Sequence, residues 1–230
     1  MVAQISRLPS LDPSRVGIIE EFGGEIIPLE PIGAQVSGVD LSSDIPPPAD
    51  VVDALEHEMA VRGFLVFKNE KQLGAEDFLR ASCWWGGKEL HSTYGGHPAT
   101  PGGNRHIFRL SNDRHHGIPG VGPQWHNDGS FNSDTFSHSG YHIIRPAERG
   151  GGTYFAHQGA AHDALTEEQK ERYLQPMIDG RFFGSAWTSS AVIIVENFVA
   201  PASASQWKLR RMANKIWSST MSALTSVATT

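Results

Sequence analysis

Cysteine, long apolar runs and excess positive charge are all scarce in this sequence. The single cysteine, Cys83, excludes an intrachain disulfide and fits a reducing compartment. The longest apolar runs, such as residues 191–195, are too short to cross a bilayer, and the N-terminal residues lack the apolar stretch of a signal peptide. These features predict a cytoplasmic protein with no membrane span.

The formal charge of −6 and the pI near 6.0 do not fit a nucleic-acid-binding surface, which needs clustered basic side chains. We therefore expect a small-molecule substrate and no nucleic-acid partner. The 230 residues, 39% of them hydrophobic, are enough for one sizeable core. The sequence does not decide the oligomeric state, and a homo-oligomer is one of the possibilities.

Acidic residues are missing from the C-terminal part. All 25 acidic residues and 15 of the 19 basic residues precede Ala200, so the charge is −10 before that residue and +4 after it. Ala, Ser and Thr make up 16 of the last 31 residues. Leu209, Met212 and Ile216 fit one stripe of a short basic helix, which we interpret as a docked or frayed helix rather than a membrane-surface or partner contact.

The 24 glycines, several of them in pairs, favour short strands joined by tight turns. A helix is predicted through Val52, Leu55 and Met59, ending at Gly63. A further helix follows at 75–85, and the capping box Thr-Glu-Glu-Gln at 166–169 begins another. Strands are predicted within residues 26–41, 63–68, 106–111, 137–145 and 150–158, and loops over residues 95–104 and 112–123.

His126 and Asp128 stand two residues apart in the stretch QWHNDGSF. On an extended segment such residues point to the same side, about 6 to 7 Å apart. An imidazole and a carboxylate placed in this way supply two thirds of the two-His-one-carboxylate triad that binds Fe(II). From the residues alone the alternative stays open that Asp128 caps the turn and His126 is merely solvated.

With these pieces in order, the sequence resembles the taurine dioxygenase (TauD/TfdA) family of Fe(II)- and 2-oxoglutarate-dependent oxygenases. The resemblance runs through IGAQVSGVDL, RGFLVFKNE, ELHSTY, WHNDGSF and GGGTYFA. It implies a mainly β fold with flanking helices (α+β), a double-stranded β-helix or jelly-roll, with iron in the mouth of the barrel. We accordingly divide the chain into an N-terminal extension (residues 1–25), a TauD/TfdA-like dioxygenase domain (residues 26–175) and a divergent C-terminal segment (residues 176–230).

The resemblance also implies roles for individual residues. His126 and Asp128 would be metal ligands to Fe(II), and Thr153 would help to hold the carboxylate of the cosubstrate 2-oxoglutarate. His91 and Tyr94 would lie on the substrate side. The implied reaction oxidises a C–H bond of a small organic substrate and releases succinate and CO2.

The chain departs from the family in one respect. The family's second histidine ligand and the arginine that pairs with 2-oxoglutarate lie late in the barrel, whereas the last histidine of this chain is His162. Arg210 and Arg211 come late enough but lack the preceding motif. We therefore expect a jelly-roll that is incomplete at its C-terminus.

This departure leaves two alternatives to an active dioxygenase. One is a catalytically inactive, truncated or divergent dioxygenase-like protein that acts only by binding. The other is a cupin-like metal enzyme in which His138 or His157 joins His126 and Asp128 as the third ligand.

Overall fold

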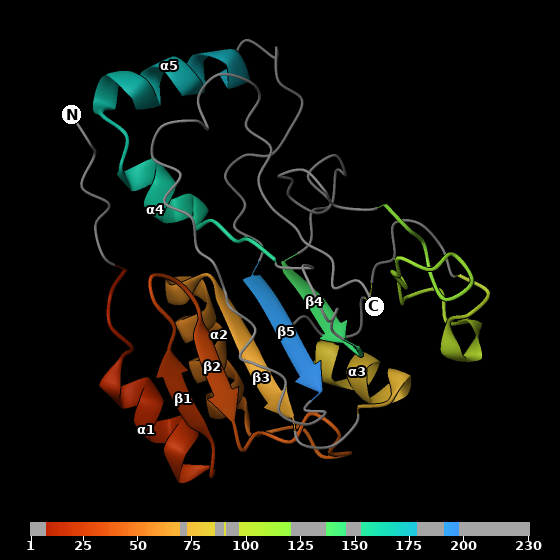
Figure 1. The fold of residues 1–230 in the computed structure, drawn as a ribbon. Helices are drawn as coiled ribbons and strands as arrows, with labels where there is room; N and C mark the ends of the chain where they lie inside the picture. The colour runs from red at the N-terminus through yellow and green to blue at the C-terminus, as the bar shows by residue number, and fades with distance from the viewer. Residues whose placement is uncertain are drawn as a thin grey trace.

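The computed structural model describes residues 8–69, 73–85, 90, 97–120, 137–145, 153–178 and 191–197. Over these ranges the chain forms α-helices and one mixed sheet (Figure 1). The helices are α1 (Pro13–Glu21), α2 (Ala49–Arg62), α3 (Ala75–Ser82), α4 (Gln158–Asp163) and α5 (Glu167–Ile178), with a short 3-10 turn at Pro101–Gly103. The strands are β1 (Glu25–Pro28), β2 (Ala34–Ser37), β3 (Phe64–Asn69), β4 (His138–Ile143) and β5 (Ala191–Asn197).

The strand order in the sheet is β1-β2-β3-β5-β4. β1 and β2 form an antiparallel pair, whereas β2–β3, β3–β5 and β4–β5 are parallel pairs. β5 is the last strand in the sequence and lies between β3 and β4, where Ile193 is in register with both Leu65 and Gly140. β5 therefore joins β4, at the end of this strand order, to the rest of the sheet (Figure 1).

Helix α2 provides most of the contact between the helical layer and the sheet. Val52, Leu55 and Met59 are buried along one side of it, in one cluster with the β3 residues Leu65 and Phe67. The helix ends where predicted, because Gly63 adopts φ +92° and donates its N–H to the Met59 carbonyl at 2.7 Å. Glycine reaches this left-handed conformation without the steric cost of a Cβ atom. The predicted helix and the strand that follows it are confirmed.

The first helix lies in the region that we separated as an N-terminal extension. Asp12 caps α1 by accepting the Ser14 N–H at 2.9 Å, and Pro13 occupies the first turn, where its missing N–H has no cost. Ile19 is fully buried in the same cluster as α2. Residues before 25 therefore contribute to the core.

Arg62, in the last turn of α2, is 2% exposed and holds the N-terminal strand region to this helix. Its guanidinium donates to the carbonyls of Pro9 (3.1 Å), Gly33 (3.2 Å) and Leu29 (2.6 Å). The Glu30 carboxylate lies 3.9 Å away and is largely exposed. Arg62 is thus a buried cation that is stabilised mainly by backbone carbonyls.

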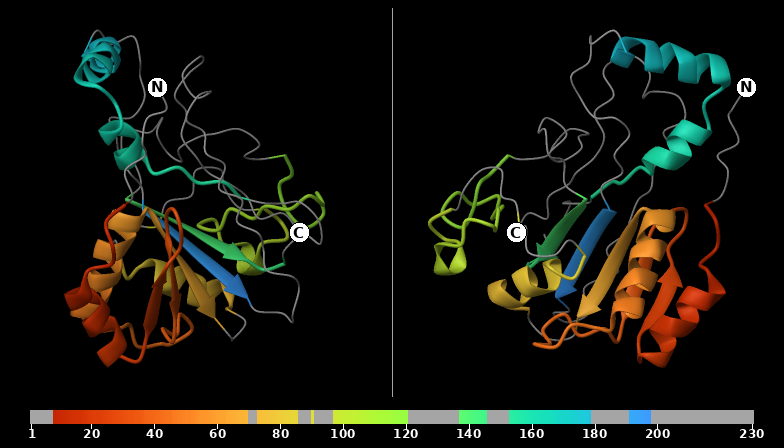
Figure 2. Two further views of the ribbon diagram at one scale, coloured as in Figure 1. Left: turned by 60° about the vertical axis from the view of Figure 1, so that its left-hand side comes forward. Right: turned by 180° about the vertical axis from the view of Figure 1, so that it is seen from behind.

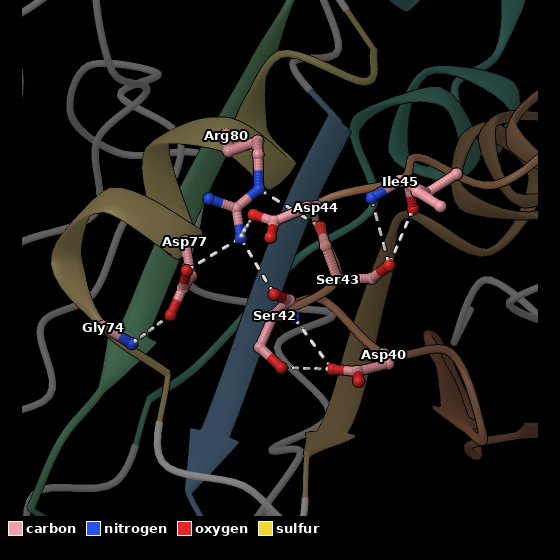
Figure 3. A network of polar contacts seen from close by, with 8 residues as sticks. All are labelled: Asp40, Ser42, Ser43, Asp44, Ile45, Gly74, Asp77 and Arg80. Carbon is pink, nitrogen blue, oxygen red and sulfur yellow. Dashed lines mark hydrogen bonds and ion pairs between the residues drawn. The ribbon is translucent and has the colours of Figure 1, made fainter.

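A second arginine, Arg80 of α3, fixes that helix to the loop between β2 and α2 (Figure 3). It donates to the carbonyls of Ser42 (2.8 Å) and Ser43 (3.1 Å) and to the Asp77 carboxylate (2.7 Å). Asp77 also accepts the Gly74 N–H at 3.0 Å, which caps the start of α3. The hydrogen bond from Arg80 lowers the pKa of Asp77, so this carboxylate stays charged as the pH falls toward its ordinary range.

Two predicted strands are wrong within the described residues. Over 106–111, an isolated bridge between Leu110 and Ile118 is the only strand-like pairing among the described residues. Residues 153–157 pair with none of the described strands, and α4 begins at Gln158. A favourable local pattern does not make a strand where no neighbour supplies the hydrogen bonds.

The start of α5 confirms the predicted capping box. The Thr166 hydroxyl accepts the Gln169 N–H at 3.2 Å, and the Gln169 side chain accepts the Thr166 N–H at 2.9 Å. With helices packed on a sheet, the described residues form a mixed α+β fold, which confirms the α+β class. Within these residues the helices hold more of the chain than the strands, so the mainly β character of the expectation is not seen there. Over the same residues, no helix combines the length and apolar character that a membrane span requires.

Candidate functional site

Thr153 opens a short extended run that lies against the sheet. Along residues 153–157 the burial alternates: Thr153, Phe155 and His157 are partly buried, whereas Tyr154 and Ala156 are exposed. The Phe155 ring packs on the Phe64 ring of β3, with ring centroids 4.7 Å apart. Because side chains alternate along an extended segment, Thr153 points to the same side as Phe155, toward the sheet.

This run covers the face of the sheet opposite α2 and α3. Phe64 and Val66 alternate along β3 with Leu65 and Phe67, which belong to the core beneath α2. Phe155 packs against the cluster that contains Phe64 and Val66. Figure 2 shows α2 and α3 together on the other side of the sheet. Thr153 therefore lies on the side away from these helices.

His138 and His142 of β4 lie on the helix-covered side. The His138 ring is 6.3 Å from the Trp85 ring between centroids, and its Nε2 atom is 3.9 Å from a carboxylate oxygen of Glu56 on α2. The His142 ring is 5.6 Å from the Phe78 ring of α3. Both imidazoles thus share one face of β4, which is the face that α2 and α3 cover.

His157 and His138 contact different elements. His157 lies against Gly63, at the junction of α2 and β3, and caps α4, whereas the His138 ring lies near Trp85 and Glu56. The two histidines that we considered as substitutes for the missing ligand are consequently separate options.

Burial lowers the pKa of His138 below its ordinary value of 6.5, and the nearby Glu56 carboxylate partly opposes this shift. Between the lowered pKa and 6.5 the unfolded chain binds a proton that the folded chain does not. We therefore expect stability to fall as the pH drops through 6.5, with a slope of at most about 1.4 kcal/mol per pH unit from this group. Urea unfolding at several pH values between 7.5 and 5.5 measures the free energy of unfolding. This free energy should fall less in His138→Gln than in wild type as the pH is lowered.

Glu56→Gln is the matched control for this prediction. Removing the carboxylate removes the effect that raises the pKa of His138, so its pKa should fall further and the pH dependence should extend to lower pH. Equal pH dependence in wild type, His138→Gln and Glu56→Gln would contradict the assignment to His138.

Four of the five residues predicted for the site lie outside the described residues, namely His91, Tyr94, His126 and Asp128. Thr153 is the one that the structure describes. In the described part of the chain, no three His, Cys, Asp or Glu side chains are grouped so that they could hold a metal ion. The predicted iron ligands and substrate contacts therefore stay predictions.

The structure adds two residues to the segment of Thr153 that the sequence analysis did not connect with it. Phe155 fixes the run to β3, and His157 caps α4 and lies against Gly63. The sequence does contain a sign of this arrangement, because Thr, Phe and His occupy alternate positions from 153 to 157. This alternation predicts only an ordinary strand. The contact of His157 with Gly63 cannot be inferred from it, because the two residues are far apart in the sequence.

The model of the family "Taurine catabolism dioxygenase TauD, TfdA family" matches residues 25–211. The chain therefore belongs to this family of dioxygenases. No curated protein and no solved structure matches it.

Proposed function

We propose that the protein is an Fe(II)- and 2-oxoglutarate-dependent dioxygenase that oxidises a C–H bond of a small organic substrate. The observation that carries the proposal is the family match, since residues 25–211 include both the His-x-Asp of residues 126–128 and the Gly-Gly-Gly-Thr of residues 150–153. We also propose that the described sheet forms part of a jelly-roll that this family membership implies.

The donor chemistry of the first motif fits ferrous iron. A neutral imidazole nitrogen of His126 and a carboxylate oxygen of Asp128 are two of the three ligand types of a facial triad, which leaves positions for a cosubstrate. In this proposal the two side chains hold the metal, and His91 and Tyr94 contribute to the substrate side.

The position of Thr153 supports its proposed role toward 2-oxoglutarate. Its side chain is partly buried, and Phe155, two residues further on, packs on the face of the sheet away from α2 and α3. A hydroxyl can donate one hydrogen bond to a carboxylate oxygen, and the glycines before Thr153 leave room for close approach. Thr153 would thus bind and orient the cosubstrate, whereas bound iron and 2-oxoglutarate would supply the oxidation by O2 that yields succinate and CO2.

Anaerobic titration of the purified protein with Fe(II) and 2-oxoglutarate tests this proposal. We expect a weak visible absorption band that needs both components and saturates with one equivalent of 2-oxoglutarate. Zn(II) in place of Fe(II) serves as the control, because it should occupy the same ligands without producing the band. Folded protein that gives no band with Fe(II) would overturn the proposal.

A catalytically inactive binding protein is the second candidate, and it is favoured by the absence of any histidine after His162 in this chain. Both candidates allow metal binding, so turnover has to separate them. Succinate release that depends on 2-oxoglutarate and O2 supports the dioxygenase. Binding of Fe(II) and 2-oxoglutarate without succinate release supports the inactive protein.

A further inference from the structure

His157 lies where three elements meet: the end of α2, the start of β3 and the start of α4. Its Cδ2 atom is 2.9 Å from the place that a Cβ atom would take at Gly63, so the imidazole is in direct contact with this glycine. On the other side of the ring, Nδ1 accepts the Ala160 N–H at 3.0 Å and caps α4. One side chain therefore joins the α2–β3 junction to the first turn of α4.

The cap determines the tautomer of the neutral ring. Nδ1 can accept a hydrogen bond only while it carries no proton, so a neutral His157 bears its proton on Nε2. Nε2 is buried, and among the described residues it has no hydrogen-bond partner. Because histidine is not among the preferred N-cap residues, this position is held by a weaker cap than Asn or Asp would provide.

Phe155 and His157 hold the segment that contains Thr153 in place. Phe155 packs on Phe64, and His157 packs on Gly63, the residue that precedes Phe64 in the sequence. In an extended segment each residue adds about 3.3 Å of length, and successive side chains point to opposite sides. Two contacts made by alternate residues therefore fix both the direction of the segment and its rotation about its own axis. Thr153 is the next residue on that side, so the orientation of its hydroxyl depends on these two contacts.

We propose that His157 is the positioning residue of the cosubstrate segment: it holds the run 153–157 against the α2–β3 junction and so orients Thr153. This inference rests on the proposed role of Thr153 toward 2-oxoglutarate. His157 acts through Thr153 and touches neither iron nor substrate in this proposal.

Two substitutions separate the cap from the ring contact. His157→Asn keeps an N-cap acceptor and removes the ring from Gly63, whereas His157→Ala removes both. The control is His162→Asn, the same change near the C-terminal end of the same helix. Circular dichroism and thermal melting establish that each variant is folded.

The first measurement is hydrogen exchange of the protein without metal or cosubstrate. We expect faster exchange in peptides that cover residues 153–165 of His157→Ala, and the control should match wild type. His157→Asn should restore slow exchange in α4. Unchanged exchange in His157→Ala would overturn the proposal without reference to any activity.

The second measurement compares two affinities in the anaerobic titration. Both His157 variants should bind 2-oxoglutarate on the order of 10-fold more weakly, as supporting residues around a bound group typically do. Their affinity for Fe(II) should stay within about twofold of wild type, because the metal ligands are unchanged.

The outcomes distinguish the two proposals. Wild-type affinity for 2-oxoglutarate in both variants, with a lower melting temperature, would show a merely structural residue and overturn the positioning role alone. Wild-type affinity in His157→Asn alone would show that the cap suffices, which overturns the role of the ring contact. Absence of 2-oxoglutarate binding in the wild type would overturn the proposed function and this inference with it.

Discussion

Replacing Arg62 by alanine is expected to lower the free energy of unfolding by about 3 to 5 kcal/mol. The change removes a buried guanidinium and leaves the carbonyls of Pro9 and Leu29 without their arginine donor. Each buried acceptor that loses its partner costs about 1 to 3 kcal/mol, and the removed side chain adds a cavity. Urea unfolding followed by far-UV circular dichroism measures the change.

Arg80→Ala is the matched control for this prediction. Arg80 also donates to two backbone carbonyls and to a carboxylate, but its side chain is 33% exposed. Water can replace an exposed donor, so the expected loss is about 1 kcal/mol or less. Equal losses in the two variants would show that burial of Arg62 does not set its contribution. The free energy of unfolding of Arg62→Lys should lie between those of wild type and Arg62→Ala. A lysine ammonium group keeps the charge but cannot reproduce the planar arrangement of N–H donors in the guanidinium group.

Replacing Asp128 by alanine is expected to weaken Fe(II) binding by on the order of 100-fold or more. Substitution of a residue that only hydrogen-bonds to a metal ligand typically lowers metal affinity about 10- to 100-fold. Substitution of a ligand itself should lower the affinity at least as much. His126→Ala should have a similar effect, since both would belong to one ligand set. Equilibrium competition with a chelator of known affinity measures the change.

Asp163→Ala serves as the control for the metal-binding prediction. Its carboxylate is largely exposed at the end of α4, and within the described part of the chain it contacts the neighbouring His162 ring, at 3.4 Å. Iron affinity should therefore equal that of wild type. Loss of iron in Asp163→Ala, or retention of full affinity in Asp128→Ala, would contradict the assignment of the ligand.

The elements that were predicted correctly are those whose signals are local. Helix α2 combines a buried stripe at helical spacing with a terminal glycine, and α5 begins with a complete capping box. Both signals act between residues at most a few positions apart, so the sequence displays them directly. The strand β3 was recognised because its apolar run follows immediately after the glycine.

The elements that were missed depend on partners distant in the sequence. Residues 106–111 and 153–157 have strand-like patterns, but within the described residues no strand pairs with them, and nothing local in the sequence reveals this. Residues 191–195 were recognised as apolar but not as an interior strand of the sheet, because their pairing with β3 spans more than 120 residues. No helix was predicted at the position of α1, because this segment has few apolar residues and residues 1–25 were assigned to an N-terminal extension.

In the candidate site, too, features with a local sequence signal were predicted, whereas features that depend on distant residues were not. The types and spacing of His126, Asp128 and Thr153 indicate a chemistry from the sequence alone, and the family match supports the class of protein. The contact of His157 with Gly63 is a product of packing, since it brings the end of one helix to the start of another. Residues that support a site are therefore harder to predict than the residues that would perform its chemistry.

The position of β5 between β3 and β4 has a consequence for biosynthesis. As the chain leaves the ribosome, β3 and β4 are both translated well before their shared partner, since residues 144–190 separate β4 from β5. Until β5 emerges, one backbone edge of β3 and one of β4 stay unpaired, and open edges of this kind recruit other chains. The nascent protein should therefore depend on chaperone protection during this interval, and its sheet should close only late in translation.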